Sequence, residues 1–368
     1  MTADRVMRQR GVTLIELMVG MAVALITTLA ISQLLIFSEA QKRIATDGTD
    51  AQINGSLALF TLQRDLQDAG YGISAIQGAL GCEVRAVYKG VERAMALAPV
   101  LITVGADGAP DMVQVMSSSK ANFSVPALIT KDHPRQAANF FVNTAMGIQV
   151  GDLMLAVPQA PDALNWCSLF QVTKTNDGTG NGLGNNQVLH NSGQSHWNNP
   201  GGATIFPAKG YPTGSYLFNL GDFIDRTYSI SEHHALQMEE FSASTGSAVT
   251  SELFPEIVQL QAYYGKDTNG NGVVDVYNKD LPTNVAEWQQ VLTVRIALVA
   301  RSTQFNREQV TFANPSWDVG SSTPVSGSSD CGTSSCVVLK VDALADWSRY
   351  RYKVFETTVP LRNMLWHS

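Results

Sequence analysis

The chain has 368 residues, of which 45 % are hydrophobic and only 15 % are charged, and its formal net charge is −7. This length is enough for one large domain or two modest ones. The negative charge argues against a protein that binds nucleic acid through a broad basic face. The composition suits a well-packed, weakly charged extracellular protein.

An apolar run near the N-terminus, residues 12–37, contains one ionisable side chain, Glu16. As a helix the run would be about 39 Å long, which exceeds the hydrocarbon core of a bilayer, about 30 Å. The run therefore predicts a single membrane-spanning helix. Three arginines precede it. The positive-inside rule places them in the cytoplasm, so everything after the run is expected in the periplasm or outside the cell.

Glu16 needs an explanation, because a carboxylate at mid-bilayer costs about 2–3 kcal/mol and somewhat less near the end of a span. If the bond after Gly11 is cut, the new α-amine of Val12 is mostly cationic at neutral pH. Glu16 lies one helical turn from that amine. It would pair with its own amine or, in a packed array of helices, with the amine of a neighbour. The pattern predicts cleavage between Gly11 and Val12 and a role in assembly for Glu16.

Two other interpretations of this run are open. An ordinary secretory signal would be cut after the run, where Ala30-Ile31-Ser32 is a weak small-x-small site. That interpretation leaves Glu16 unexplained. The other is an ordinary single-pass anchor in which the glutamate occurs by chance.

The basic leader, Gly11, the following Val12-Thr13-Leu14-Ile15-Glu16 and the uninterrupted apolar run together resemble the class III leader of type IV prepilins and type II secretion pseudopilins. The resemblance implies that a prepilin peptidase removes residues 1–11 and that Val12 is N-methylated. The chain departs from the family at this position, because phenylalanine is the usual first mature residue.

A second apolar stripe predicts that the helix continues through residues 38–70 and packs against a globular head. Its members recur at helical spacing: Ile53, Leu57 and Phe60, with Leu59, Leu62 and Leu66 beside them. Gly48 and Gly55 interrupt the pattern and predict a loosened turn near residues 46–55. The helix is expected to stop at Ala69-Gly70-Tyr71-Gly72, where glycine can adopt the left-handed conformation.

After this point the chain changes to short runs rich in Val, Leu, Phe and Tyr that are bounded by turn residues, which predicts strands. The clearest are Met112–Met116, Asp152–Val157, Ser168–Thr173, Ser215–Leu220, Arg226–Ser231, Ile257–Tyr264, Val291–Ala300, Val337–Val341 and Tyr350–Val359. Long polar loops are expected at Thr175–Gly202 and Asn314–Gly332. The predicted fold class is α+β and pilin-like: a long N-terminal transmembrane helix followed by a large β-rich head, residues 71–368.

Three segments narrow the resemblance to PilW-type minor pilins of type IV pilus assembly: Leu62–Tyr71 (LQRDLQDAGY), Ala262–Gly272 (AYYGKDTNGNG) and Thr357–Asn363 (TTVPLRN). Between about residues 72 and 250 the resemblance is diffuse. It implies a protein without enzymatic activity that waits in the bacterial inner membrane, joins a complex that primes pilus assembly and sits at the pilus tip. The implied partners are the prepilin peptidase, the major pilin, the other minor pilins and a tip adhesin.

Two rival functions remain. A minor pseudopilin of type II secretion would share the leader and the helix, and the neighbouring genes would distinguish it. A membrane-anchored periplasmic enzyme or sugar-binding protein would keep its leader and would be stabilised by a ligand.

The segment Asp267–Asp275 fits the first half of an EF-hand-type calcium loop. Its expected ligands are the side chains of Asp267, Asn269, Asn271 and Asp275 and the carbonyl of Val273. Gly272 permits the sharp turn. Position 12 holds Asn278 in place of a bidentate glutamate, and Asp280 is another candidate late ligand. The PilW-type resemblance strengthens the expectation of bound Ca²⁺; the alternative is a hairpin loop without metal.

The four cysteines fit an oxidising compartment. Of the three possible pairings, the preferred one joins Cys331 to Cys336 across a short loop and leaves Cys82 with Cys167. A zinc site is the competing interpretation, but the sequence has no CxxC spacing.

The sequence contains no GxSxG, HExxH or Walker motif. The glycine-rich segment Gly178–Gly184 does not fit GxGxxG in either frame and predicts a flexible loop. Glu232-His233-His234 predicts a turn, because adjacent strand residues point to opposite faces and would not form a metal pair.

Overall fold

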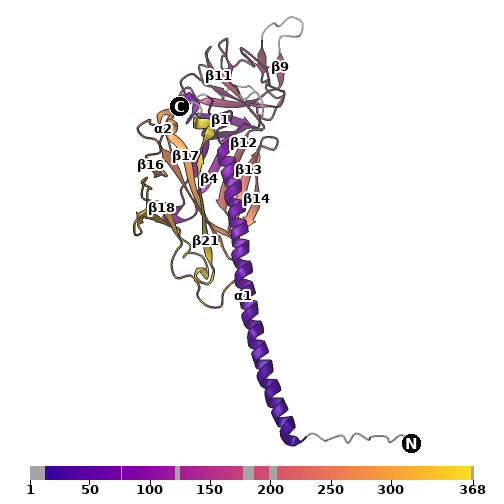
Figure 1. The fold of residues 1–368 in the computed structure, drawn as a ribbon. Helices are drawn as coiled ribbons and strands as arrows, with labels where there is room; N and C mark the ends of the chain where they lie inside the picture. The colour runs from indigo at the N-terminus through magenta and orange to yellow at the C-terminus, as the bar shows by residue number, and fades with distance from the viewer. Residues whose placement is uncertain (1–12, 76, 121–124, 177–185, 199–204, 366–368) are drawn as a thin grey trace, which may run out of the picture. The chain divides into compact units, whose positions relative to one another are not determined.

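A computed structural model of the chain describes residues 13–75, 77–120, 125–176, 186–198 and 205–365. The chain divides into two compact units, Met1–Asp50 and Ala51–Ser368. The predicted α+β class is confirmed: an N-terminal apolar helix is followed by a large head that is rich in strands (Figure 1).

One helix, α1, runs without interruption from Leu14 to Asp68, and its part up to Asp50 belongs to the first unit. Every large apolar side chain from Leu14 to Phe37 is exposed over more than half of its area. The segment Leu14–Glu39 is long and apolar enough to cross a membrane. These features match the membrane-spanning run expected from the sequence.

The part of α1 in the second unit lies close to strand β21 (Tyr352–Pro360). A β-carbon added to Gly55 would be 2.1 Å from the Phe355 ring, so the contact requires a residue without a side chain. The predicted loosened turn near residues 46–55 is wrong, because all of these residues are helical. Gly55 therefore serves close packing, which offsets its low helix propensity.

The face of α1 that the head buries includes Leu62 and Leu66 of the predicted stripe but differs from it elsewhere. The buried face combines small residues and two leucines: Ala51, Gly55, Ala58, Leu62 and Leu66. Ile53, Leu57 and Phe60 are 49 %, 47 % and 62 % exposed, so the prediction that they pack against the head is wrong. Small side chains let the helix approach the strands, and the closer contact of the whole face outweighs the larger apolar area of these three side chains.

The end of α1 is capped by the other end of the chain. Gly70 has a φ of 78° and Gly72 a φ of 75°, in the left-handed conformation expected after a helix. The side-chain amide of Asn363 donates hydrogen bonds to the carbonyls of Asp68 and Ala69, over 3.3 and 3.0 Å. Two of the carbonyls that a helix end leaves free are thereby satisfied.

All strands between residues 83 and 221 except β3 and β4 form two of the sheets, near the labels β11 and β9 in Figure 1. A six-stranded sheet has the order β2-β1-β8-β7-β11-β5 and a three-stranded sheet the order β6-β10-β9. Their strands are β1 (Glu83–Tyr88), β2 (Val91–Ala96), β5 (Ala127–Leu128), β6 (Asn139–Phe141), β7 (Leu153–Val157), β8 (Cys167–Gln171), β9 (Lys174–Asn176), β10 (Gln187–Leu189) and β11 (Tyr216–Gly221).

The remaining three sheets combine β3 and β4 with the strands that follow residue 223. Their orders are β14-β13-β12-β4-β3, β16-β15-β17-β21 and β18-β20-β19. Their strands are β3 (Val100–Thr103), β4 (Met112–Ser117), β12 (Ile224–Ile230), β13 (Ala235–Ser242), β14 (Ser247–Pro255), β15 (Ile257–Lys266), β16 (Val276–Asn278), β17 (Val291–Arg301), β18 (Ser316–Gly320), β19 (Ser329–Asp330) and β20 (Ser335–Val338). Two short helices, α2 (Val285–Gln289) and α3 (Arg362–Leu365), and three 3₁₀ turns (Gln77–Ala79, Ala106–Gly108, Trp347–Arg349) complete the described elements.

Each of the nine predicted strands overlaps an observed strand. The two predicted long loops are only partly loops. Thr175–Gly202 contains β10 and the end of β9, and Asn314–Gly332 contains β18 and β19. These strands have two to five residues and carry polar side chains, so no run of apolar residues marks them in the sequence.

Candidate functional site

The predicted cleavage site, Gly11 and Val12, lies outside the described residues. Immediately after it, Thr13 caps the first turn of α1 together with Glu16. The Glu16 Oε2 accepts hydrogen bonds from the Thr13 backbone N–H at 3.0 Å and from the Thr13 hydroxyl at 3.1 Å. The Glu16 N–H donates to the Thr13 hydroxyl at 3.3 Å. This reciprocal capping box places the carboxylate at the positive end of the helix dipole.

The predicted calcium loop forms the turn between β15 and β16 and is organised by Asp267. This carboxylate is buried and accepts backbone N–H bonds from four successive residues, Asn269 to Gly272, at 2.6 to 3.2 Å. Burial acts to raise the pKa of Asp267, but the four donors outweigh it and hold the pKa below its ordinary value. Asp267 is therefore ionised and fixed in place.

The other predicted ligands gather on the same turn. The Asn269 side-chain amide donates to Asp275 Oδ1 at 2.8 Å, which brings positions 3 and 9 of the loop together. Asn271 Oδ1 accepts the Val273 N–H at 2.8 Å. Asn278, at position 12, lies in β16, and its Oδ1 accepts the Asp280 N–H.

This donor set fits a weakly held hard cation. It supplies side-chain oxygens on a glycine turn, but only two carboxylates, so carbonyls and water would complete the shell. The described residues contain no group of three or more His, Cys, Asp and Glu side chains placed to hold a metal.

The structure contains two disulfides, Cys82–Cys167 and Cys331–Cys336, in the preferred pairing. The first joins the start of β8 to the residue before β1, in a sheet where these strands run parallel. The second closes the turn between β19 and β20. None of the described cysteines is free to hold zinc.

A polar anchor that the sequence does not reveal holds α1 on the head. Asp65 is buried, and its Oδ2 accepts hydrogen bonds from the Tyr228 hydroxyl at 2.6 Å and from Arg226 at 2.9 Å. Burial, reinforced by the Asp65 charge, raises the pKa of Tyr228 well above its ordinary value, so this hydroxyl remains a donor. Both partners lie in β12, more than 160 residues along the chain.

A second unexpected group is a buried histidine pair that packs beside strands β6 and β8. The Nε2 atoms of His133 and His190 are 3.0 Å apart, and the His133 ring stacks on Phe140 with ring centroids 3.6 Å apart. Burial lowers the pKa of His133 to about 4 and that of His190 to about 3, the second also through the charge of the first. Both rings are neutral at neutral pH.

Two other segments singled out in the sequence are the histidine-containing turn and the glycine-rich segment. Glu232–His234 forms the turn between β12 and β13, as predicted. There the His233 Nδ1 lies 3.0 Å from Glu252. The glycine-rich segment Gly178–Gly184 lies outside the described residues.

Two family models match the chain. Residues 223–363 match type IV pilus-assembly protein W. Residues 6–32 match the prokaryotic N-terminal methylation motif. Neither a curated protein nor a solved structure matches the chain.

The first match extends from β12 to α3 and includes the calcium-type loop and the strands that bury α1. The second covers residues 6–11 of the predicted leader, Glu16 and much of the apolar helix. The resemblance expected from the sequence is therefore confirmed at both ends of the chain, where an N-terminal methylation motif and a segment similar to type IV pilus-assembly protein W occur together.

Proposed function

We propose that this minor pilin takes part in priming type IV pilus assembly and sits at the pilus tip. The observation that carries the proposal is the combination, in one chain, of a methylation-type N-terminus, an apolar helix and a large PilW-type head. The helix would act twice. It would first hold the protein in the inner membrane with the head in the periplasm, and would then move into the filament core, exchanging lipid for neighbouring helices.

The partners in this proposal are the prepilin peptidase, the major pilin, the other minor pilins and a tip adhesin. Glu16 would act in assembly. Its carboxylate already caps the first turn of α1, so a neighbour's N-terminal amine would meet an ordered acceptor.

We further propose that the chain has no enzymatic activity, since the family it matches is named for pilus assembly and the sequence carries no catalytic motif. A pseudopilin of type II secretion remains the nearest rival. Deleting the gene and testing separately for pilus formation and for protein secretion would distinguish the two roles.

Replacing Gly11 with leucine is expected to abolish maturation, because a bulky side chain before the cut would block the peptidase. Full-length protein should then accumulate in the inner membrane, measured by intact mass after membrane extraction. Gly20→Leu is the matched control: it makes the same change within the apolar helix, where an added side chain meets no described neighbour within 4 Å. Normal processing of the Gly11 variant, or a mature N-terminus near Gln33, would overturn the pilin assignment.

We propose that the Asp267–Asp275 loop binds Ca²⁺. At a free concentration ten times Kd, binding to the folded state alone would stabilise the head by about 1.4 kcal/mol. The measurement is thermal melting of residues 38–368 in millimolar Ca²⁺ and in EGTA. Asp275→Asn is the informative variant, since it keeps acceptors for the Thr268 N–H and hydroxyl but removes one of the two carboxylates. Equal melting of parent and variant under both conditions would identify the loop as a hairpin without metal.

A further inference from the structure

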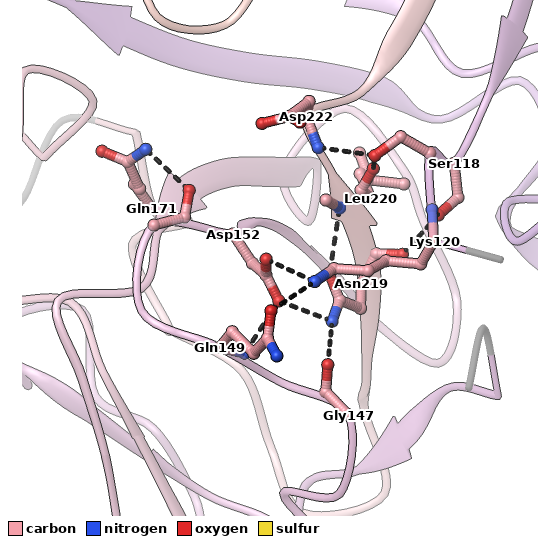
Figure 2. Close-up of polar contacts among 12 residues, drawn as sticks. Ser118, Lys120, Gly147, Gln149, Asp152, Gln171, Asn219, Leu220 and Asp222 are labelled. Carbon is pink, nitrogen blue, oxygen red and sulfur yellow. Dashed lines mark hydrogen bonds and ion pairs between the residues drawn. The ribbon is translucent and has the colours of Figure 1, made fainter. Parts of the chain in front are cut away.

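A lysine, an aspartate and an asparagine from three separate segments meet inside the head (Figure 2). Lys120 follows β4, Asp152 precedes β7 and Asn219 lies in β11. The Lys120 Nζ is 2.8 Å from Asp152 Oδ1, and the Asn219 Nδ2 is 2.9 Å from Asp152 Oδ2. The side chain of Lys120 is 20 % exposed and that of Asp152 is 9 % exposed, while Asn219 is 3 % exposed. One carboxylate thus holds an amine and a carboxamide in a largely dry site.

The asparagine is fixed on both sides of its amide. Its Oδ1 accepts the Gly221 N–H at 3.0 Å, and its Nδ2 also donates to the Gly147 carbonyl at 3.1 Å. A hydrogen bond to the amide oxygen withdraws electrons from Cγ and would stabilise negative charge that develops on that oxygen. The side-chain carbon Cγ of Asn219 is therefore the electrophile that this hydrogen bond activates.

The lysine is held toward the same strand. The backbone N–H of Lys120 donates to the Ser118 hydroxyl at 3.1 Å. That hydroxyl donates to the backbone carbonyl of Asn219 at 2.9 Å. Lys120 Nζ also reaches the Gln149 side chain at 3.3 Å. The segment that carries the amine is thus fastened to the strand that carries the amide, which removes much of the entropic cost of bringing them together.

An ordinary buried ion pair would account for Lys120 and Asp152 alone. It would not require the Asn219 amide, whose Nδ2 donates to the second oxygen of Asp152. Nor would it require the hydrogen bond that the oxygen of this amide accepts from the Gly221 N–H. These are the three groups that amide exchange needs: an amine nucleophile, a carboxamide electrophile and a carboxylate that carries protons. We propose that Lys120 and Asn219 become joined by an isopeptide bond in the folded head, with Asp152 as the proton carrier.

The reaction needs no other reactant. The ammonium of Lys120 passes a proton to Asp152, which leaves both groups neutral in a site where charge is poorly solvated. The free amine attacks Cγ of Asn219, the Nζ–Cγ bond forms, and the charge on Oδ1 is held by the Gly221 N–H. Asp152 then gives its proton to Nδ2 and takes one from Nζ. The Cγ–Nδ2 bond breaks, and ammonia leaves.

The bond would fasten two parts of the head that share no strand. Lys120 extends from β4, in the five-stranded sheet beside α1, whereas Asn219 belongs to the six-stranded sheet. The Cys82–Cys167 disulfide already closes a loop within the six-stranded sheet. An isopeptide bond would add a link between the sheets that reduction cannot break.

The experiment is intact mass and tryptic mapping of the full-length protein after membrane extraction. The expected mass is lower by one ammonia than that of the processed chain with two disulfides. The map should contain one branched peptide that joins Lys120 to Asn219, with no cleavage after Lys120. Lys120→Arg keeps a cation beside Asp152 but supplies a much poorer nucleophile, so this variant should have the full mass.

Asp152→Asn is the second test variant, because it keeps a hydrogen-bonding group in place but removes the proton carrier. It is expected to yield linear peptides only. A parent protein with full mass and separate peptides for Lys120 and Asn219 would overturn the proposal. So would an ammonia loss without a branched peptide, which would assign the loss to another site.

Discussion

Lowering the pH from about 6.5 to about 4 is expected to destabilise the head by several kcal/mol through His133 and His190. Burial depresses both pKa values, to about 4 and about 3, whereas the unfolded chain protonates histidine near 6.5. Below that pH the unfolded state binds protons that the folded state does not. The free energy of unfolding therefore falls by about 1.4 kcal/mol per pH unit for each histidine, until the folded pKa is reached. Above about 6.5 the pair adds no pH dependence.

The measurement is urea unfolding of residues 38–368 at a series of pH values. A His133→Leu, His190→Leu double variant keeps apolar volume in the cluster but cannot titrate, so its stability should depend much less on pH. His233→Gln is the matched control, because the His233 side chain lies in a turn and is 83 % exposed. Parallel curves for the parent and the double variant would show that the pair does not govern acid sensitivity.

Removing the Cys82–Cys167 disulfide is expected to cost more stability than removing Cys331–Cys336, although each change replaces two cysteines. The cysteines of the first pair are 85 residues apart in sequence and those of the second are 5 apart. On the chain-entropy account, the longer loop restricts the unfolded chain more, by about 4–5 kcal/mol against about 2 kcal/mol. The first pair is also buried, so alanine there leaves a cavity as well.

This comparison uses denaturant unfolding of the two Cys→Ala double variants beside the parent under non-reducing conditions. The variant without Cys331–Cys336 is the control, because it also loses one disulfide and two cysteines but closes only a short loop. Equal losses of stability, or a larger loss at the turn between β19 and β20, would contradict the expectation.

Features of the fold that depend on local pattern could be predicted from the sequence. The membrane-spanning run, the helix stop at the glycines and the nine clearest strands all follow from residues close together in the chain. The choice of helix face could not be predicted. Ile53, Leu57 and Phe60 form the more hydrophobic stripe, but the head buries the face with Gly55, whose fit depends on Phe355, 300 positions later.

The candidate sites also differ in whether their residues are close together in the sequence. The calcium-type loop lies within nine consecutive residues, so its spacing could be read directly, although whether it binds Ca²⁺ stays a prediction. Asp65 and its partners in β12 are more than 160 residues apart. Lys120, Asp152 and Asn219 come from three segments with no shared motif. Only the fold brings such groups together, and no single-sequence pattern marks them.

The cap that Asn363 places on α1 sets an order on biogenesis. The carbonyls of Asp68 and Ala69 emerge early in synthesis, but the amide that satisfies them is made almost 300 residues later. The strand that contacts Gly55 is equally late. Until these last segments have been synthesised, Leu62 and Leu66 lack part of their final surroundings and stay exposed to chaperones and proteases. The packing of α1 against the head can therefore be completed only after synthesis has passed residue 363.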